Sequence, residues 1–439
     1  MKQTKTNFKQ TEIGMIPEEW EETIFSEVID VNPKRELKKG AKAKFVSMAD
    51  IQPFTRKISN FIIKEFRGGS KFKKGDTLFA RITPCLENGK TAFVTILEDK
   101  EIGFGSTEFI VLSAKNEKTD PLFVYYLSIS PEIRNIAIKS MTGTSGRQRV
   151  ENDVFDNIFI KIPPLPEQRA IAKILSDLDS KIELNQQMNK TLEAIGQAIF
   201  KHWFVDFEFP NEEGKPYKSS GGEMVYNEEL GKEIPKGWEV KELKKIVSRL
   251  GPGTNFQPKR TDVGIPFLNV KNISNGFLDL SDVKYISNED YAWVHKSWKP
   301  EEHDLLISRI GTLGNVAIIR KEDLPLSVHY NIIDIKPGDV DYAFLYFLLT
   351  SEFFQKEYHL RKVQTVQEYI TIDNVETIKI ALPDNKLLKK ISLVFFNLIN
   401  KMEINYTSIK TLSSIRDSLL PKLMSGKIRV PLEVVKNDA

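Results

Sequence analysis

The stretch KIELNQQMNKTLEAI at residues 181–195 returns 220 positions later as KMEINYTSIKTLSSI at residues 401–415. A repeat at this distance is far too long for a solenoid and indicates two copies of one domain pattern. The same register extends upstream into the segment before each helix. There Val150, Asp153, Ile158, Ile160 and Pro163 correspond to Ile370, Asp373, Ile378, Ile380 and Pro383. The chain is therefore one pattern written twice.

The repeat also covers the start of each copy. Ile16–Trp20 corresponds to Ile234–Trp238, and Asp76–Ile82 corresponds to Asp304–Ile310 at the larger offset of 228, so the second copy carries extra residues early on. In each copy about 150 residues alternate short β-rich runs with Gly, Asn and Asp turns, and a helical stretch then begins after a proline. This order predicts a β-rich domain followed by a long helix, twice.

The two helical stretches carry matching apolar stripes with alternating spacings of three and four residues, which favours a paired coil. We expect the two helices to form an antiparallel coiled coil between two pseudo-symmetric β-rich domains, an α+β fold. Asn185 and Asn405 fall on the stripes, where a polar residue fixes register; the alternative is that both are solvated. The predicted seam residues are Leu178, Ile182, Asn185, Leu192, Leu398, Met402, Asn405 and Leu412.

Composition shifts along the chain suggest domain boundaries. A Pro-, Gly- and Ser-rich segment lies between the two copies and is typical of a connector. We predict a first β-rich domain at 1–165, a helix at 166–205, the connector at 206–233, a second β-rich domain at 234–383, a second helix at 384–426 and a tail at 427–439.

The overall charge does not announce a partner. Lys and Arg total 63 against 60 for Asp and Glu, a net charge of +3, so any nucleic-acid surface must arise from local placement. The single cysteine, Cys85, fits a reducing compartment. No apolar signal-peptide core and no membrane-length apolar run is present in the sequence. We expect a cytoplasmic protein with no membrane partner and no metal.

The order of these parts resembles the specificity subunit of type I restriction-modification enzymes. The resemblance rests on the runs IKIPPLPEQR at 160–169, FVDFEFP at 204–210, GDTLFAR at 75–81 and IPKGW at 234–238, and it covers essentially the whole chain. It implies two target-recognition domains separated by two long helices, each domain reading one half of a bipartite, asymmetric DNA site.

The resemblance also implies partners. It predicts a non-catalytic chain that binds double-stranded DNA and scaffolds two modification (methyltransferase) subunits, with restriction (ATP-dependent translocase and nuclease) subunits joining. This chain would bind no cofactor, and S-adenosylmethionine for adenine-N6 methylation would sit on the partner methyltransferase. The alternative is a recognition subunit of a related restriction system with a fused methyltransferase-nuclease partner.

A glycine-flanked polar loop is the first candidate for DNA contact. Arginine suits guanine edges, glutamine suits adenine, and hydroxyls suit phosphates. The counterpart loop of the second copy lacks both arginines, which fits a domain that reads different bases. An ordinary solvated loop is the alternative. The candidates are Thr144, Ser145, Arg147, Gln148 and Arg149 in the first copy and Gln364, Thr365 and Gln367 in the second.

Arg81 and Arg309 occupy the same place after a strand in both copies. A shared role suggests phosphate anchoring, and a structural salt bridge is the alternative. The further candidates near these strands are Thr83, Lys90, Thr312, His329 and Asn331, with core or rim packing as the alternative for His329 and Asn331.

Other functional classes lack their motifs in this sequence. We find no Asp/Asn-Pro-Pro-aromatic methyltransferase motif, no glycine-rich cofactor loop after a strand and no metal-spaced histidine pair among five histidines. A stand-alone nuclease or methyltransferase is thus disfavoured. A transcription factor would show a compact helix-turn-helix module, and none stands out.

Overall fold

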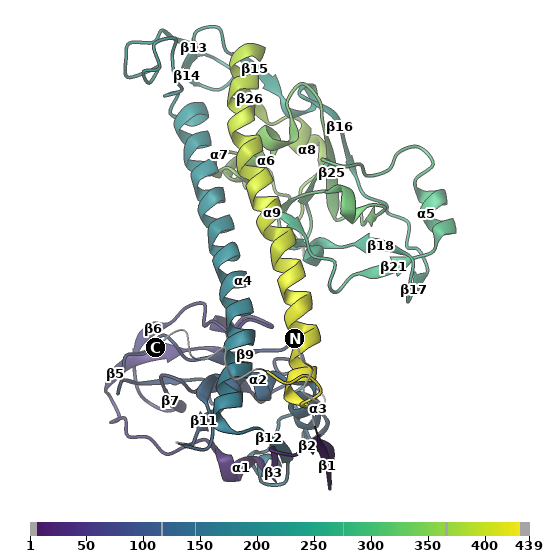
Figure 1. Ribbon diagram of the computed structural model, residues 1–439. Helices are drawn as coiled ribbons and strands as arrows, with labels where there is room; N and C mark the ends of the chain where they lie inside the picture. The colour runs from purple at the N-terminus through teal and green to yellow at the C-terminus, as the bar shows by residue number, and fades with distance from the viewer. Residues whose placement is uncertain (1–6, 116, 145, 275, 365–367, 431–439) are drawn as a thin grey trace. The chain divides into compact units, whose positions relative to one another are not determined.

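The computed structural model describes residues 7–115, 117–144, 146–274, 276–364 and 368–430. The chain forms two compact units: unit 1 comprises Met1–Gln186 and Thr407–Ala439, and unit 2 comprises Gln187–Tyr406. The division falls inside two long helices, α4 (Leu165–Phe200) and α9 (Asn385–Met424), so each unit holds one copy of the β-rich region and part of both helices (Figure 1). The α+β fold with a repeated domain is confirmed.

Unit 1 begins with a hairpin and contains two four-stranded sheets. Its elements before α4 are β1 (Phe8–Thr11), β2 (Gly14–Pro17), β3 (Glu21–Ile24), α1 (Phe25–Val28), β4 (Ile29–Val31), β5 (Lys42–Val46), β6 (Ile62–Glu65), β7 (Ser70–Lys73), β8 (Thr77–Ala80), β9 (Thr91–Phe93), β10 (Ile102–Gly105), β11 (Phe109–Ala114), α2 (Pro121–Ile129), α3 (Pro131–Lys139) and β12 (Phe159–Ile162).

Unit 2 follows a similar order after α4, with additional elements such as α5 (Asn288–Val294) and α8 (Ile372–Glu376). Its elements before α9 are β13 (Met224–Asn227), β14 (Lys232–Pro235), β15 (Glu239–Glu242), β16 (Val247–Pro252), β17 (Arg260–Thr261), β18 (Ile265–Leu268), β19 (Ile273–Ser274), β20 (Phe277–Leu278), β21 (Lys284–Ile286), α5 (Asn288–Val294), β22 (Leu305–Ser308), β23 (Val316–Ile318), β24 (Ser327–Val328), β25 (Ile332–Pro337), α6 (Tyr342–Thr350), α7 (Glu352–Leu360), α8 (Ile372–Glu376) and β26 (Lys379–Leu382). The π-helical turn Lys201–Val205 lies between α4 and the connector, so the regular helix ends earlier than its apolar pattern suggests.

The sheets show which parts of the repeat are shared. The orders β4-β11-β8-β9 in unit 1 and β16-β25-β22-β23 in unit 2 match strand for strand. The other sheets share an antiparallel and a parallel pairing but differ in the fourth strand: the order is β6-β5-β10-β7 in unit 1 and β17-β21-β18-β24 in unit 2. One sheet is thus a common frame, and the other differs between the copies.

Each unit also contains two short helices that the β-rich prediction omitted. The carboxylate of Asp120 caps α2 and the hydroxyl of Ser130 caps α3, and Asp341 and Ser351 cap α6 and α7 in the same way. In α6 every residue from Ala343 to Leu349 is buried. A helix buried on all sides shows no amphipathic stripe, so its sequence does not announce it.

The two long helices pair antiparallel within each unit. In unit 1 Asp179 of α4 forms an ion pair with Arg416 of α9. Glu167, which is nearer the start of α4, forms an ion pair with Arg429, which follows the end of α9. In unit 2 the amide of Asn405 donates to Asn189 at 2.8 Å, and Phe200 packs on Phe395. In both units, residues later in α4 therefore lie opposite residues earlier in α9, so the two helices run antiparallel.

The predicted seam residues are placed as follows. Asn185 and Asn405 are buried, and in unit 2 Asn189 also donates to the carbonyl of Met402 at 3.0 Å. A buried amide that is hydrogen-bonded across the helix pair specifies register, whereas a solvated one does not. Ile182 and Met402 are buried, and Leu178, Leu192, Leu398 and Leu412 are half-buried.

Candidate nucleic-acid interface

In unit 1 the loop at 141–149 is attached to the segment that follows β8. The amide of Val150 donates to the carbonyl of Arg81 at 2.9 Å, and the amide of Thr83 donates to that of Gln148 at 3.0 Å. Thr142 and Arg149 close the base of the loop with two main-chain hydrogen bonds of 3.0 and 2.8 Å. The structure therefore brings Arg81, Thr83 and the loop together.

Acidic residues hold two of the arginines of this cluster, Arg81 and Arg149. The guanidinium of Arg149 forms a bidentate pair with Glu108, with Nη2 at 2.8 Å and Nε at 3.0 Å from its oxygens. Hydrogen bonds to Glu108 raise the pKa of Arg149. Arg81 pairs with Glu151 at 3.3 Å. Such pairs orient guanidinium groups before a ligand arrives, and they also contribute to the fold. In the protein without DNA, Arg81 thus forms the salt bridge that the sequence analysis gave as the alternative to phosphate anchoring.

The other unit 1 candidates differ in accessibility. Thr144 and Arg147 are exposed and Gln148 is half-buried, so the loop presents these side chains to solvent. Thr83 donates to the sulfur of Met141 at 3.9 Å. Lys90 donates to the carbonyl of Met48 at 2.9 Å, a structural hydrogen bond. Ser145 lies outside the described residues.

Unit 2 builds the same main-chain frame with different side chains. The amide of Arg309 donates to the carbonyl of Asn331 at 2.9 Å, as that of Arg81 does to Glu108 at 3.0 Å. The amide of Ile370 donates to Arg309 at 3.0 Å, and Tyr369 bridges to Ile310 as Arg149 bridges to Ile82. The frame thus carries Glu108 and Arg149 in unit 1 but Asn331 and Tyr369 in unit 2.

Two polar atoms in the unit 2 frame are buried without a hydrogen-bond partner among the described residues, namely Nε of Arg309 and Oδ1 of Asn331. Unsatisfied buried groups are uncommon and call for a reason such as a ligand or a water. Thr312 and Gln364 are exposed, and Thr365 and Gln367 lie outside the described part of the chain.

An aromatic and basic cluster lies beside His329. Its ring is 4.4 Å from that of Tyr330 and 5.9 Å from that of Phe267, and the guanidinium of Arg260 stacks over Phe267 at 4.3 Å. Burial and the nearby Arg260 lower the pKa of His329, so it is neutral at physiological pH. Sequence reasoning missed Glu108, which lies 41 residues from its partner Arg149 in the chain.

A buried acid pair distinguishes unit 2 electrostatically. Asp304 and Asp334 both contact the guanidinium of Arg249, while in unit 1 Arg35 holds one carboxylate, Asp76, at 2.6 Å. Burial and the neighbouring Asp304 raise the pKa of Asp334 to about 8. Two carboxyls beside one cation therefore share a proton at neutral pH.

We expect the stability of unit 2 to fall as the pH rises from about 5 to about 8. The folded Asp334 keeps its proton to about pH 8, whereas the unfolded carboxyl loses it near its ordinary value. The stabilising contribution is complete below the unfolded pKa and is lost as pH rises through the folded one. Urea unfolding across this range should show a flatter decline for Asp334→Asn. Asp339→Asn, at an exposed site nearby, should keep the wild-type slope, and equal slopes for wild type and Asp334→Asn would contradict the assignment.

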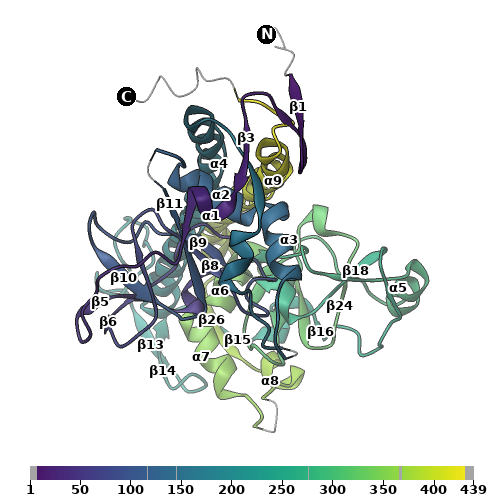
Figure 2. The ribbon, with the colours of Figure 1, turned by 90° about the horizontal axis from the view of Figure 1, so that it is seen from below.

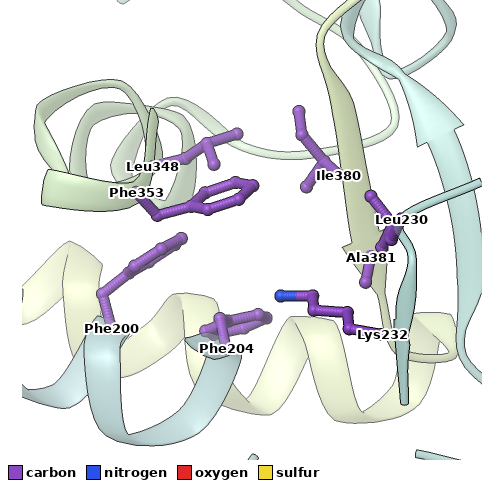
Figure 3. A pocket seen from close by; sticks show the side chains of 8 residues that line it. All are labelled: Phe200, Phe204, Leu230, Lys232, Leu348, Phe353, Ile380 and Ala381. Atoms are coloured by element: carbon purple, nitrogen blue, oxygen red, sulfur yellow. The ribbon is translucent and has the colours of Figure 1, made fainter. Parts of the chain in front are cut away.

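Figure 3 shows a small cavity in unit 2 into which the ammonium of Lys232 projects among aromatic rings. The lysine Nζ lies 5.2 Å from the ring centre of Phe207 and 5.4 Å from that of Phe353, and burial lowers its pKa. The cavity of about 10 Å³ holds at most one water. It is a packing feature that ties β14 to unit 2.

Among the residues that the structure describes, no group of His, Cys, Asp and Glu side chains could hold a metal ion. Within the same residues, no helix is both long enough and apolar enough to cross a bilayer.

Comparison with known proteins identifies the class that these repeated frames define. The family model of the type I restriction modification DNA specificity domain matches the chain twice, at residues 17–194 and 235–414. The chain therefore belongs to this family, and the resemblance stated from the sequence is confirmed.

Particular relatives agree with the family. The chain is 28% identical to the type I restriction enzyme MjaIX specificity subunit of Methanocaldococcus jannaschii, covering 97% of each chain. It is 27% identical to the HindI specificity subunit of Haemophilus influenzae, over 84% of this chain and 90% of that one. A crystal structure of the type I restriction-modification S subunit from M. genitalium is 16% identical, with a TM-score of 0.49, and covers 92% of this chain and 96% of that one. Specificity subunits are the non-catalytic members of type I systems, and this chain is one of them.

Proposed function

We propose that this chain recognises a bipartite, asymmetric DNA site, with unit 1 reading one half and unit 2 the other. The observation that carries the proposal is the repeated main-chain frame: both copies place a loop against an arginine after a strand, yet the side chains on that frame differ. A common frame suits phosphate anchoring, and different side chains suit different bases. The reading residues would include Arg147, Gln148 and Arg149 in unit 1.

The proposed partners follow from the family. Double-stranded DNA is the ligand, two modification subunits bind the helices, and restriction subunits join them. S-adenosylmethionine binds to the methyltransferase subunits, which transfer its methyl group to adenine N6, while this chain supplies only the DNA sequence specificity. We propose that the chain binds this DNA in the cytoplasm. The boundaries at 165, 205, 233, 383 and 426 remain our proposal for exchangeable modules, with the paired helices setting the number of unspecified bases between the half-sites.

Exposed residues of the long helices support two equivalent docking surfaces for the modification subunits. Leu184 and Ile415 of unit 1 are 52% and 42% exposed, and their repeat counterparts in unit 2, Ile404 and Ile195, are 53% and 43% exposed. Residues in the seam must be complementary between the helices because the helices pack there, but solvent-facing positions have no such requirement within this chain. Apolar side chains that recur at equivalent exposed positions indicate one partner that binds twice.

Glutamate at one docking surface should remove one modification subunit from the complex. Leu184→Glu with Ile415→Glu is expected to leave a complex with a single modification subunit, because a charge cannot enter an apolar contact. Combining it with Ile404→Glu and Ile195→Glu should remove both. Native mass spectrometry of the co-expressed subunits measures this. The control is Gln186→Glu with Ser414→Glu, exposed positions of the same two helices in unit 1 that do not share a helical face with Leu184 and Ile415. Full occupancy in the fourfold variant would rule these surfaces out.

Exchange of residues 1–165 for the corresponding domain of another specificity subunit tests the function itself. Methylome sequencing of cells that carry the chimera and the cognate modification subunit should show one half of the methylated site replaced and the other retained. The reciprocal exchange of 234–383 should alter the opposite half. Alteration of both halves by either exchange would contradict reading by separate units, and absence of any sequence-specific methylation with the wild-type chain would contradict the function.

A further inference from the structure

Positive charge is concentrated in one short segment of unit 1. Residues 34–74 contain 13 Lys and Arg but only 3 Asp and Glu, in a chain with 63 and 60 overall. The remaining residues therefore hold 50 basic against 57 acidic side chains. The near-neutral total conceals a strongly basic region in an otherwise slightly acidic protein.

This basic segment supplies three strands of the sheet β6-β5-β10-β7. Lys64 lies over the ring of Phe45 at 4.6 Å, and Lys71 lies over that of Phe66 at 5.0 Å. The register pairs Phe45 with Ile62, which is 53% exposed, whereas Val46 and Phe72 on the other side of the sheet are buried in a core cluster. The side that carries Phe45 therefore faces away from this core. Figure 2 shows β5, β6 and β10 close together in unit 1. Ammonium groups resting on aromatic rings are held at the surface of the sheet.

A lysine-rich turn extends the same face. The amide of Gly40 donates to the carbonyl of Phe66 at 2.9 Å, and the amide of Phe66 donates to that of Ala41 at 2.8 Å, which fixes the turn bearing Lys38 and Lys39 beside Phe66. We call Lys38, Lys39, Lys64, Lys71, Phe45 and Phe66 the basic face.

The basic face has no neutralising acid of its own. Lys38, Lys39 and Lys64 are exposed, and none has a carboxylate within ion-pair distance among the residues that the structure describes. The one acid of β6, Glu65, pairs with Arg67 at 3.5 Å. In the sheet, Glu65 lies opposite Lys42 and Lys64 lies opposite Ala43. Because side chains alternate along a strand, Glu65 points to the other side of the sheet from Lys64. The lysines therefore repel one another unless an anion is present.

β10 connects the sheet of the basic face to the proposed reading cluster. β10 ends at Gly105, and only three residues separate it from Phe109, which begins β11. The last of these three, Glu108, holds the guanidinium of Arg149. A polyanion seated on the basic face could thus run directly to the loop that we propose reads bases.

Unit 2 lacks an equivalent. From Arg260 in β17 to Ile286 in β21, the corresponding sheet carries three basic residues, Arg260, Lys271 and Lys284, against Asp262, Asp279 and Asp282. Lys271 is paired with Asp282 at 2.5 Å. The two units therefore differ in charge as well as in their fourth strand.

From this asymmetry we infer that the basic face is a docking surface for the sugar-phosphate backbone of duplex DNA beside the first half-site, a sequence-independent anchor that only unit 1 possesses. The inference rests on the proposed function. Three exposed ammonium groups without acidic neighbours match the regular row of phosphates on a duplex, and each phosphate neutralised releases counterions. Phosphate contacts add affinity and fix position but carry no sequence information.

Replacement of three lysines by glutamine tests this surface in the complex with the modification subunits. We expect Lys38→Gln, Lys39→Gln and Lys64→Gln together to weaken binding to a duplex without the target at low salt. The slope of log affinity against log salt should shrink by about two to three, since each lost phosphate contact removes about 0.9. The preference for target over non-target duplex and the methylated sequence should not change. The control carries Lys218→Gln, Lys244→Gln and Lys245→Gln, exposed positions in unit 2, and should retain the wild-type slope.

The outcomes separate the two proposals. A triple variant with the wild-type slope and affinity overturns the basic face while the proposed function stands. A triple variant that changes the methylated sequence also overturns it, because the lysines would then read bases. Loss of subunit assembly with unchanged DNA binding by the complex that remains would make the surface a protein contact and overturn it as well. A wild-type complex without any target preference would instead overturn the proposed function.

Discussion

Replacement of Arg416 by alanine is expected to lower the free energy of unfolding by about 3–5 kcal/mol, the usual result of removing one partner of a buried ion pair. Arg416 Nη1 lies 2.8 Å from Asp179, whose side chain is 4% exposed and also accepts a hydrogen bond from Tyr126 at 2.7 Å. Without the guanidinium, a buried carboxylate would keep only one neutral donor. The loss follows from the charge left behind, not from the attraction alone.

Urea or thermal unfolding measures this effect, and two further variants interpret it. Arg416→Ala combined with Asp179→Asn should be less destabilised than Arg416→Ala alone, because no uncompensated charge remains. Asp417→Ala removes the exposed partner of the same arginine, at 2.8 Å, and should change stability by less than about 0.5 kcal/mol. A loss below about 1 kcal/mol for Arg416→Ala would show that the pair is not desolvated as described.

Replacement of Gly196 by valine should destabilise unit 2 by about 1–3 kcal/mol through overpacking. A Cβ at this position would lie 2.0 Å from Cε1 of Phe347, a ring that is fully buried and packs on Phe395 at 4.8 Å. Helix propensity alone argues the other way, since glycine inside a helix is about 1 kcal/mol worse than alanine. The clash wins because the ring has no free space into which it can move.

The sign of the alanine variant decides between these two effects. Gly196→Ala should destabilise, whereas an ordinary solvent-facing helical glycine would give a gain of about 1 kcal/mol. Combination with Phe347→Leu should restore part of the stability lost by Gly196→Val. Ala198→Val, at an exposed position of the same helix, serves as the matched control and should stay within about 0.7 kcal/mol of wild type. A stabilised Gly196→Ala protein would contradict the contact with Phe347.

These two positions also show how the copies diverge on one frame. Gly196 and Arg416 are repeat counterparts, 220 residues apart, as are Ile399 and Asp179. In unit 1 a buried ion pair joins the two helices, and its Asp179 also accepts a hydrogen bond from Tyr126 of α2, whereas in unit 2 Phe347 of α6 packs against Gly196. The side chains in contact are complementary in charge or in volume within each unit, but the two units use different residues, since each side chain must fit only its own partner.

Much of the candidate site could not be predicted from the sequence. Glu108 and Arg149 are 41 residues apart, and no local pattern links them. The frame could be anticipated, because Arg81 and Arg309 end matching strands, but the attachment of the loop to them could not. The basic segment at 34–74 was visible in the composition, yet charge runs are usually solvated faces, and only the strand register assigns its lysines to one side of a sheet.

The sequence by itself determined the repeat and the existence of two long helices, because periodicity and internal identity can be read from the order of residues without knowing which distant residues meet. Only the tertiary structure decided which partners meet: Asp179 with Arg416, Gly196 with Phe347, and Arg149 with Glu108. Such contacts join residues far apart in the chain. Their energies depend on burial and on distances of a few ångströms, which the order of residues does not encode in any short stretch.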